Sequence, residues 1–199
     1  MTIGNRVAYG EAFCETKEKL FWFVFYKKYF NIELEKDFKL DIPLGYNSKI
    51  HTNVFIPKGL IVKQALNAIK RAGVNIIYSR TDELTESDDR DSNSSYSVFF
   101  SKDIECKINQ SSYSAEKIWS QHLNGTTFLE MLILWLRTYV EGNGTKLNCS
   151  IGVLCTGTRL FGHQIPAIIW VKDLNEGLKI YHVSCKEEVK KIGVRLVNE

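Results

Sequence analysis

The most regular hydrophobic pattern in the chain lies at residues 127–141, TFLEMLILWLRTYVE. Apolar side chains recur there three or four positions apart, which is the spacing of one face of an α-helix. The opposite side is also largely apolar, and a helix that is apolar on nearly every side is a buried helix. Thr127 and Glu130 have the spacing of a capping box, and residues 142–144 offer left-handed C-cap residues. The pattern therefore predicts a central helix that is covered by a sheet.

A second apolar block, TKEKLFWFVFYKKYF, occupies residues 16–30, and seven of its last 11 residues are aromatic. The aromatic content is typical of a buried strand, but the length favours a helix, and we predict a helix. The simplest interpretation places the block in the core. The alternative is a surface for a partner or a membrane, because Lys17, Lys19, Lys27 and Lys28 flank the apolar run.

Residues 52–79 contain the clearest succession of elements. A short strand at 53–56 and a Pro-Lys-Gly turn lead into an amphipathic helix at 60–72, with alanine and isoleucine on one face and polar or charged residues on the other. Gly73 suits the C-cap of this helix, and the apolar run at 74–79 is typical of a strand. We expect a compact strand–helix–strand unit.

The rest of the chain predicts shorter elements. Further strands are expected at 31–39, 96–101, 104–109, 147–155, 165–171, 178–184 and 194–197. Short helical segments are expected at 114–123 and 186–191. The strand at 165–171 is apolar on both faces, which indicates a central strand, and 178–184 is its expected hairpin partner.

Together these elements predict an α+β fold, in which a strand–helix–strand unit is followed by a buried central helix packed on a largely antiparallel C-terminal sheet. We expect an α/β N-terminal subdomain at residues 1–90, with an acidic loop at its end, and an α+β C-terminal subdomain at 91–199. At 199 residues the chain is also short enough to form a single domain.

The composition, with 44% apolar and 25% charged residues, is that of an ordinary folded protein, and the net charge is only +3. The charge is unevenly distributed, since residues 1–80 have 13 basic and 7 acidic side chains and residues 81–105 have 2 and 8. Recognition of nucleic acid requires a clustered basic face. Binding to nucleic acid is therefore left open by the sequence but has no support in it.

Two features bear on the cellular compartment. Residues 1–14 are polar and are followed by no apolar core of a signal peptide, and the apolar run at 20–26 is too short to span a bilayer as a helix. The five cysteines have no framework spacing, which favours reduced thiols. We therefore expect a cytoplasmic protein without a transmembrane segment.

The stretch at residues 80–95 is acidic, and Asp89, Asp91 and Asn93 fall at alternating positions, as in a calcium-binding loop. An EF-hand loop also needs a central glycine and a terminal bidentate glutamate, and both are missing here. We expect a solvated, flexible loop instead.

Cysteine and histidine residues offer no clear metal site. Cys149 and Cys155 share the strand parity of apolar neighbours and should point into the core. With His163, His182 and Cys185 they make a conceivable zinc set, but the sequence has no Cys-x₂-Cys or His-x₃₋₅-His pair. His182 and Cys185 lie three positions apart at a strand end, where side chains seldom touch, so we expect no nucleophile–base pair. We predict no metal and no cofactor.

One spacing is similar to an enzyme motif. Glu105 and Lys107 form a Glu-x-Lys tripeptide on an expected strand, downstream of Asp91. This order resembles that of the restriction-endonuclease-like nucleases, in which an aspartate and a glutamate hold a divalent metal and the lysine orients the attacking water. The apolar approach that usually precedes the aspartate is absent. A metal-dependent nuclease that uses Asp91, Glu105 and Lys107 is therefore the alternative hypothesis.

Residues 156–164, TGTRLFGHQ, contain two glycines between expected strands, but no Gly-Lys-Ser/Thr sequence that would bind phosphate. We interpret them as a hairpin loop. Arg159, Phe161 and His163 are its candidates for contact with a partner, and Arg159 and His163 are expected to be exposed at its tip.

Residues 55–79, FIPKGLIVKQALNAIKRAGVNIIYS, combine a strand, an Ile-Pro-x-Gly-like turn, an Ala-Leu helix, a glycine and a Val/Ile/Tyr strand. This segment resembles the "secretin and TonB short" N-terminal module of secretins and TonB-dependent receptors. The resemblance implies a small α/β plug or docking domain that binds other envelope proteins, has no catalytic role and lies in the periplasm.

No set of polar residues in the sequence has the combined chemistry of a catalytic site. The sequence therefore favours a non-enzymatic protein-interaction or assembly component, and the resemblance suggests a secretion or envelope complex as its setting. We expect a protein partner, and the sequence does not determine the oligomeric state.

Overall fold

The computed structural model describes most of the chain. It covers residues 15–42, 46, 50–78, 85–101, 114–142, 152–171, 176–189, 192–194 and 197. Helices and a mixed, largely antiparallel sheet are both present in these residues, which confirms the predicted α+β class.

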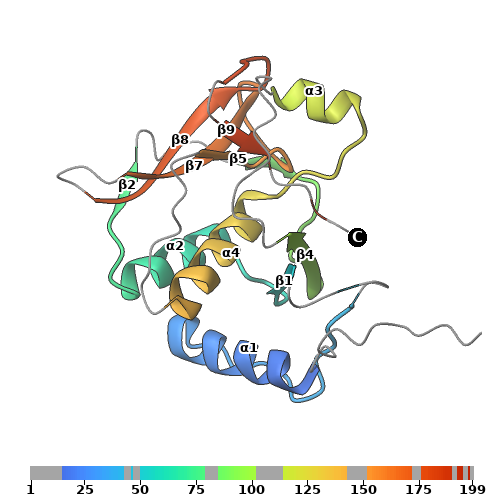
Figure 1. Cartoon of the computed structure of the whole chain (residues 1–199), viewed down its shortest axis with the longest axis vertical. Helices are drawn as coiled ribbons and strands as arrows, with labels where there is room; N and C mark the ends of the chain where they lie inside the picture. Colours follow the sequence, from blue (N-terminus) through green and yellow to red (C-terminus); the bar gives the residue numbers. More distant parts are fainter. Residues whose placement is uncertain are drawn as a thin grey trace, which may run out of the picture.

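The described residues form the following elements. The helices are α1 (Glu15–Phe30), α2 (Val62–Arg71), α3 (Ala115–Ser120) and α4 (Phe128–Glu141). The strands are β1 (His51–Ile56), β2 (Ile76–Tyr78), β3 (Thr85–Asp88), β4 (Tyr96–Ser101), β5 (Gly152–Leu154), β6 (Thr158–Leu160), β7 (Gln164–Val171), β8 (Gly177–Ser184) and β9 (Ile192–Val194). Figure 1 shows the strands of the large sheet at one end of the molecule and α1 at the other, with α2 and α4 between them.

Helix α4 is the central helix that the hydrophobic pattern predicts. The Thr127 hydroxyl accepts a hydrogen bond from the Glu130 backbone N–H at 3.2 Å, and the Glu130 carboxylate accepts one from the Thr127 N–H at 2.9 Å, which completes the predicted capping box. The first ten residues of the helix are all buried. Of the three candidates for a left-handed C-cap, Gly142 is not left-handed: its φ is −81°, and its N–H donates to the Thr138 carbonyl at 3.0 Å. Residues 143 and 144 lie outside the described residues.

One hydrophobic core joins α4 to its neighbours. Trp135 stacks on Trp170 of β7, with ring centroids 5.4 Å apart, and on Tyr139 at 5.3 Å. Side chains of α1, α2, β1, β4 and β8 belong to the same buried cluster. The central helix therefore packs on the sheet through Trp135, as expected, and is covered by helices elsewhere.

The large sheet has seven strands. Five of them follow the order β2-β8-β7-β5-β9, while β6 pairs with both β3 and β7. The long β7–β8 hairpin is antiparallel, with Ile168 opposite Ile180, which confirms the predicted central strand and its hairpin partner. The outer pairs β2–β8 and β5–β9 are parallel.

The strands that flank α2 belong to different sheets. β1 pairs antiparallel with β4 in a two-stranded sheet, with Val54 opposite Val98, whereas β2 pairs with β8. The predicted order of strand, helix and strand is confirmed, but the two strands do not pair, because each finds its partner later in the chain. Gly73 has a φ of +85°, the left-handed conformation predicted at the end of α2.

Three further predictions are wrong in the described residues. Residues 31–39 form no strand, and their apolar side chains pack from an irregular segment, as where the Phe38 and Phe55 rings lie 4.6 Å apart. Residues 186–189 form the end of a turn, irregular chain and an isolated bridge instead of a helical turn. The expected loop at 156–164 contains the strand β6, which pairs with β3 and β7.

The acidic stretch also differs from its prediction where it is described, from residue 85 onward. It forms the strand β3, and the Asp89 N–H then donates to the Gly157 carbonyl at 2.7 Å. The Ser92 hydroxyl donates to the Leu60 carbonyl at 2.7 Å. These contacts, together with the β2–β8 pairing, cross the subdomain boundary expected near residue 90.

Candidate protein-interaction surface

Helix α1 has apolar side chains on all sides, so the core can bury only some of them. Its inner side presents Trp22 and Tyr26 to β1. The Trp22 indole N–H donates to the side-chain carbonyl of Asn53 at 2.9 Å, and the Tyr26 hydroxyl donates to the Phe55 backbone carbonyl. Burial raises the pKa of Tyr26 well above its usual value, so the hydroxyl remains a donor. These two bonds fix the inner side of α1 on the core.

A buried arginine determines how α1 is rotated. Arg137 of α4 donates to the Glu18 carboxylate at 3.2 Å (Nη2–Oε2), to Glu141 at 2.8 Å (Nη2–Oε1) and to the Asn53 backbone carbonyl at 2.7 Å (Nη1–O). Burial acts to lower the pKa of Arg137, but the hydrogen bonds and charges of the two carboxylates raise it overall, so the guanidinium stays charged. Because Glu18 is held in this way, the opposite side of α1 faces solvent.

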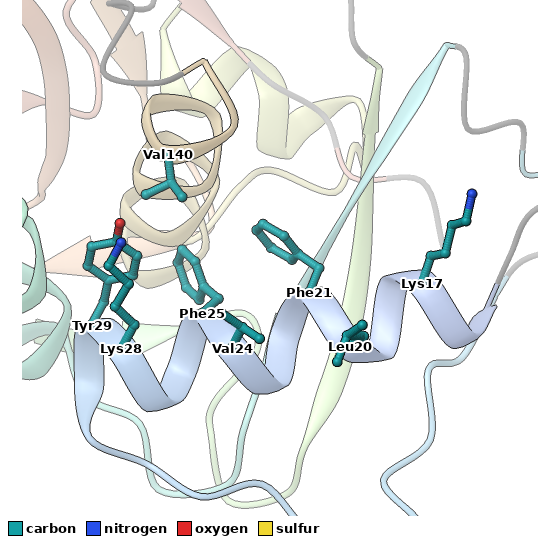
Figure 2. A pocket seen from close by; sticks show the side chains of 8 residues that line it. All are labelled: Lys17, Leu20, Phe21, Val24, Phe25, Lys28, Tyr29 and Val140. Carbon is teal, nitrogen blue, oxygen red and sulfur yellow. The ribbon is translucent and has the colours of Figure 1, made fainter.

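The outward side of α1 carries a groove of about 390 Å³ that is mainly apolar. Leu20 is 61% exposed and Val24 is 57% exposed. The lining residues are Lys17, Leu20, Phe21, Val24, Phe25, Lys28 and Tyr29 of α1 and Val140 of α4. Figure 2 shows Phe21 and Phe25 pointing toward α4, with Lys17 near one end of the helix and Lys28 near the other. Exposed apolar residues that gather in a concave surface are typical of a contact site.

The charges around the groove are unevenly satisfied. Both carboxylates of α1 form ion pairs with basic side chains, and Lys27 pairs with Glu33. Within the described parts of the chain, Lys17 and Lys28 have no ion-pair partner, although the Lys28 ammonium lies 5.1 Å from the centroid of the Tyr29 ring. The groove is therefore apolar along its length and positive at both ends.

The three residues of the expected hairpin loop that are candidates for contact with a partner are not equally exposed. Phe161 and His163 lie in the turn between β6 and β7 and are exposed, Phe161 to 56%. Arg159 is only half-exposed, because β6 places it beside Asp89, to which it donates at 2.6 Å, and over the Trp119 ring, 4.6 Å from its centroid. The expectation of a freely exposed Arg159 is therefore wrong. A single exposed aromatic residue such as Phe161 is normal on a protein surface.

The structure describes one of the three residues of the alternative nuclease hypothesis. Asp91 is exposed, and its carboxylate accepts hydrogen bonds from the Asn93 backbone N–H at 2.9 Å and from the Asn93 side chain at 2.6 Å. Glu105 and Lys107 lie outside the described residues. The nuclease alternative therefore stays a prediction.

Of the two cysteines that the strand pattern places in the core, the structure describes Cys155, which lies there as predicted. Cys155 is fully buried, and Cys149 lies outside the described residues. Cys185 is also buried, and its sulfur lies 3.7 Å from a carboxylate oxygen of Glu116. Among the described residues, no group of three or more His, Cys, Asp or Glu side chains could hold a metal ion.

A polar cluster at the start of α4 is absent from the sequence predictions. Arg90 donates two hydrogen bonds to the buried Glu130, and Asp88 accepts one from the Thr158 hydroxyl. That hydroxyl accepts in turn from the Phe128 N–H at 2.8 Å. Since each of these carboxylates is bound by the chain itself, the cluster ties β3 and β6 to α4. Only the capping-box position of Glu130 points to it in the sequence.

Comparison with known proteins gives no relative: no protein-family model, no curated protein and no solved structure matches the chain. In the parts of the chain that the structure describes, no helix is both long enough and apolar enough to cross a membrane.

Proposed function

We propose that this chain is a non-enzymatic protein-interaction component that binds a protein partner through the groove on α1. The observation that carries the proposal is the exposure of Leu20 and Val24 in a groove with mainly apolar walls. Removing apolar surface from water contributes about 25 cal/mol per Å² to association. A partner segment laid along the groove covers both side chains and gains this free energy.

The anchoring of α1 supports the same function. Trp22 and Tyr26 bond to β1, and Arg137 bonds to Glu18, so the groove is held by the core before a partner arrives. A preorganised surface loses less conformational entropy on binding than a segment that must first fold. The exposed side of α1 is therefore suited to recognition.

The cellular setting is part of the proposal. Cys155 and Cys185 are buried thiols outside any disulfide, which is compatible with a reducing compartment, and we favour the cytoplasm. The resemblance of residues 55–79 to the secretin and TonB short module makes an envelope or secretion assembly the alternative setting to test.

The proposal is tested by site-specific photo-crosslinking of the full chain. A photoreactive phenylalanine analogue replaces Val24 in the groove, and in a matched variant it replaces Ile61 at the start of α2, which is similarly exposed at 53%. Each protein is irradiated in an extract of the native host, and adducts are identified by mass spectrometry. We expect position 24 to give a discrete protein adduct that position 61 does not give and that Leu20→Glu abolishes. Identical adducts from both positions, or none from position 24, contradict the proposal.

A further inference from the structure

The groove on α1 follows a straight line. Lys17, Phe21, Val24 and Lys28 succeed one another at intervals of four, three and four residues, so they lie along one side of the helix. At about 1.5 Å of rise per residue, the two lysine Cα atoms are about 16 Å apart. Val140 of α4 stands beside this line and makes the surface concave, as Figure 2 shows. A straight apolar stripe beside a second helix is a surface on which an amphipathic helix packs.

The two lysines determine the chemistry of such a helix. Lys17 and Lys28 are exposed at the ends of the groove, and neither has an ion-pair partner among the described residues. Acidic side chains placed opposite them are attracted, whereas basic side chains are repelled. The spacing of the lysines also matches the length of a helix of about three turns.

On the basis of the proposed function, we infer that the partner docks an amphipathic helix of about three turns on α1. This helix presents apolar side chains at spacings of three and four residues, and acidic side chains near its two ends, opposite Lys17 and Lys28. The apolar positions supply most of the affinity, and the acidic positions select the partner and its direction.

Two other occupants fit the groove less well. If a second copy packed α1 on α1 about a two-fold axis, Lys17 of one copy would lie near Lys28 of the other, and the like charges would repel. An anionic lipid surface is flat, whereas the groove is concave beside Val140.

The inference is tested by selection from a displayed library of helix-forming peptides of about 14 residues, which are about 21 Å long. The positions of one helical face and both ends are randomised. Selection is run on the wild-type chain, on Val24→Glu, on the charge reversal Lys17→Glu/Lys28→Glu and on the control reversal Lys36→Glu/Lys63→Glu, which makes the same change of net charge at exposed sites elsewhere. Each variant is first shown to be folded by circular dichroism.

We expect the wild type and the control reversal to enrich peptides with apolar residues at helical spacing between acidic ends. The groove reversal should enrich basic ends, and wild-type peptides should bind it about tenfold more weakly, since two favourable pairs become repulsive. Enrichment on the wild type that is lost on Val24→Glu but shows no charge preference keeps the proposed function and overturns the inference. No enrichment on the wild type overturns the inference, whereas the proposed function is decided separately by the crosslinking at position 24. Flotation of the wild type with vesicles of phosphatidylcholine and phosphatidylglycerol, abolished by Val24→Glu, assigns the groove to lipid and also overturns the inference.

Discussion

Arg90 and Glu130, 40 positions apart in the sequence, form a bidentate ion pair at the start of the central helix. The Arg90 Nε lies 2.7 Å from Glu130 Oε1, and its Nη2 lies 2.9 Å from Oε2. The Glu130 side chain is fully buried, and that of Arg90 is 18% exposed. The pair links the segment after β3 to α4, so loss of the pair should destabilise the packing of the central helix.

We expect Arg90→Met to destabilise the chain by about 3–5 kcal/mol, because Glu130 keeps its place in the interior without a charged partner. Urea unfolding of the wild type and the variant gives the free energy of unfolding. Glu130→Gln preserves an oxygen that accepts from the Thr127 N–H but removes the charge. The double variant Arg90→Met/Glu130→Gln should therefore lose less free energy of unfolding than the sum of the losses of the two single variants. Additive losses would mean that the two side chains do not interact in solution.

The same ion pair should protect Arg90 from trypsin. The acidic stretch looks like a flexible loop in the sequence, whereas in the structure the Arg90 guanidinium binds Glu130 and the Gly125 carbonyl. Lys36 is a matched site, because it lies exposed in a turn and, like Arg90, precedes an aspartate. We expect early digestion to cut at Lys36 before Arg90, and Glu130→Gln to speed cleavage at Arg90. Early cleavage at Arg90 in the wild type, identified by fragment masses, would restore the flexible-loop prediction.

Trp135 should be among the costliest side chains to truncate. It is 2% exposed and stacks on Trp170 of β7 and on Tyr139. We expect Trp135→Ala to cost about 3–5 kcal/mol in urea unfolding, because a large cavity forms where α4 meets the sheet. Phe161→Ala, at a 56% exposed position, serves as the control and should change stability by less than about 0.5 kcal/mol. Equal midpoints for the two variants would exclude α4 as the centre of the core.

The elements predicted well from the sequence are those whose local signals agree with each other. In α4 the apolar period and the Thr127–Glu130 capping box indicate the same helix, and both are present in the structure. In α2 the amphipathic pattern ends at Gly73, which has the predicted positive φ. Sheet membership is different, because nothing in the sequence of β1 indicates that it pairs with β4 instead of β2.

The failed predictions are those that depend on distant partners. An acidic, Ser-rich stretch is typical of a loop, and its order here arises from β6, Gly157 and Glu130, which lie far along the chain. At residues 31–39 the apolar alternation is real, but an irregular segment also buries alternate side chains, as it does with Phe38.

The candidate surface illustrates the same limit. The sequence identifies an aromatic helix flanked by lysines, and four of its seven aromatic side chains are buried. A helix that is apolar all round does not reveal which side faces solvent. The side that faces solvent is determined by Arg137 of α4, which binds the Glu18 carboxylate of α1. Leu20 and Val24, on the opposite side of α1, are therefore exposed.

Asp88 should give the stability of the chain a distinctive pH dependence. Burial raises the pKa of its carboxyl above the usual value, although the hydrogen bond from Thr158 acts in the opposite direction. Folding therefore disfavours the ionised form of Asp88. The contribution of Asp88 to the free energy of unfolding is greatest at a pH below about 3.9, the pKa of aspartate in the unfolded chain. This contribution declines as the pH rises through the higher pKa of Asp88 in the folded chain.

Asp88→Asn keeps a side-chain oxygen that can accept the hydrogen bond from the Thr158 hydroxyl, but the side chain can no longer ionise. We expect the variant to gain stability relative to the wild type as the pH rises from about 4 to about 7, measured by urea unfolding at each pH. Asp37→Asn, in an exposed turn, is measured in parallel to subtract the effect of removing one negative charge from the surface. A variant that instead loses stability relative to the wild type over this range would show that ionised Asp88 stabilises the fold. In that case its contact through Thr158 with the Phe128 N–H, at the positive end of the α4 dipole, outweighs the cost of burying the charge.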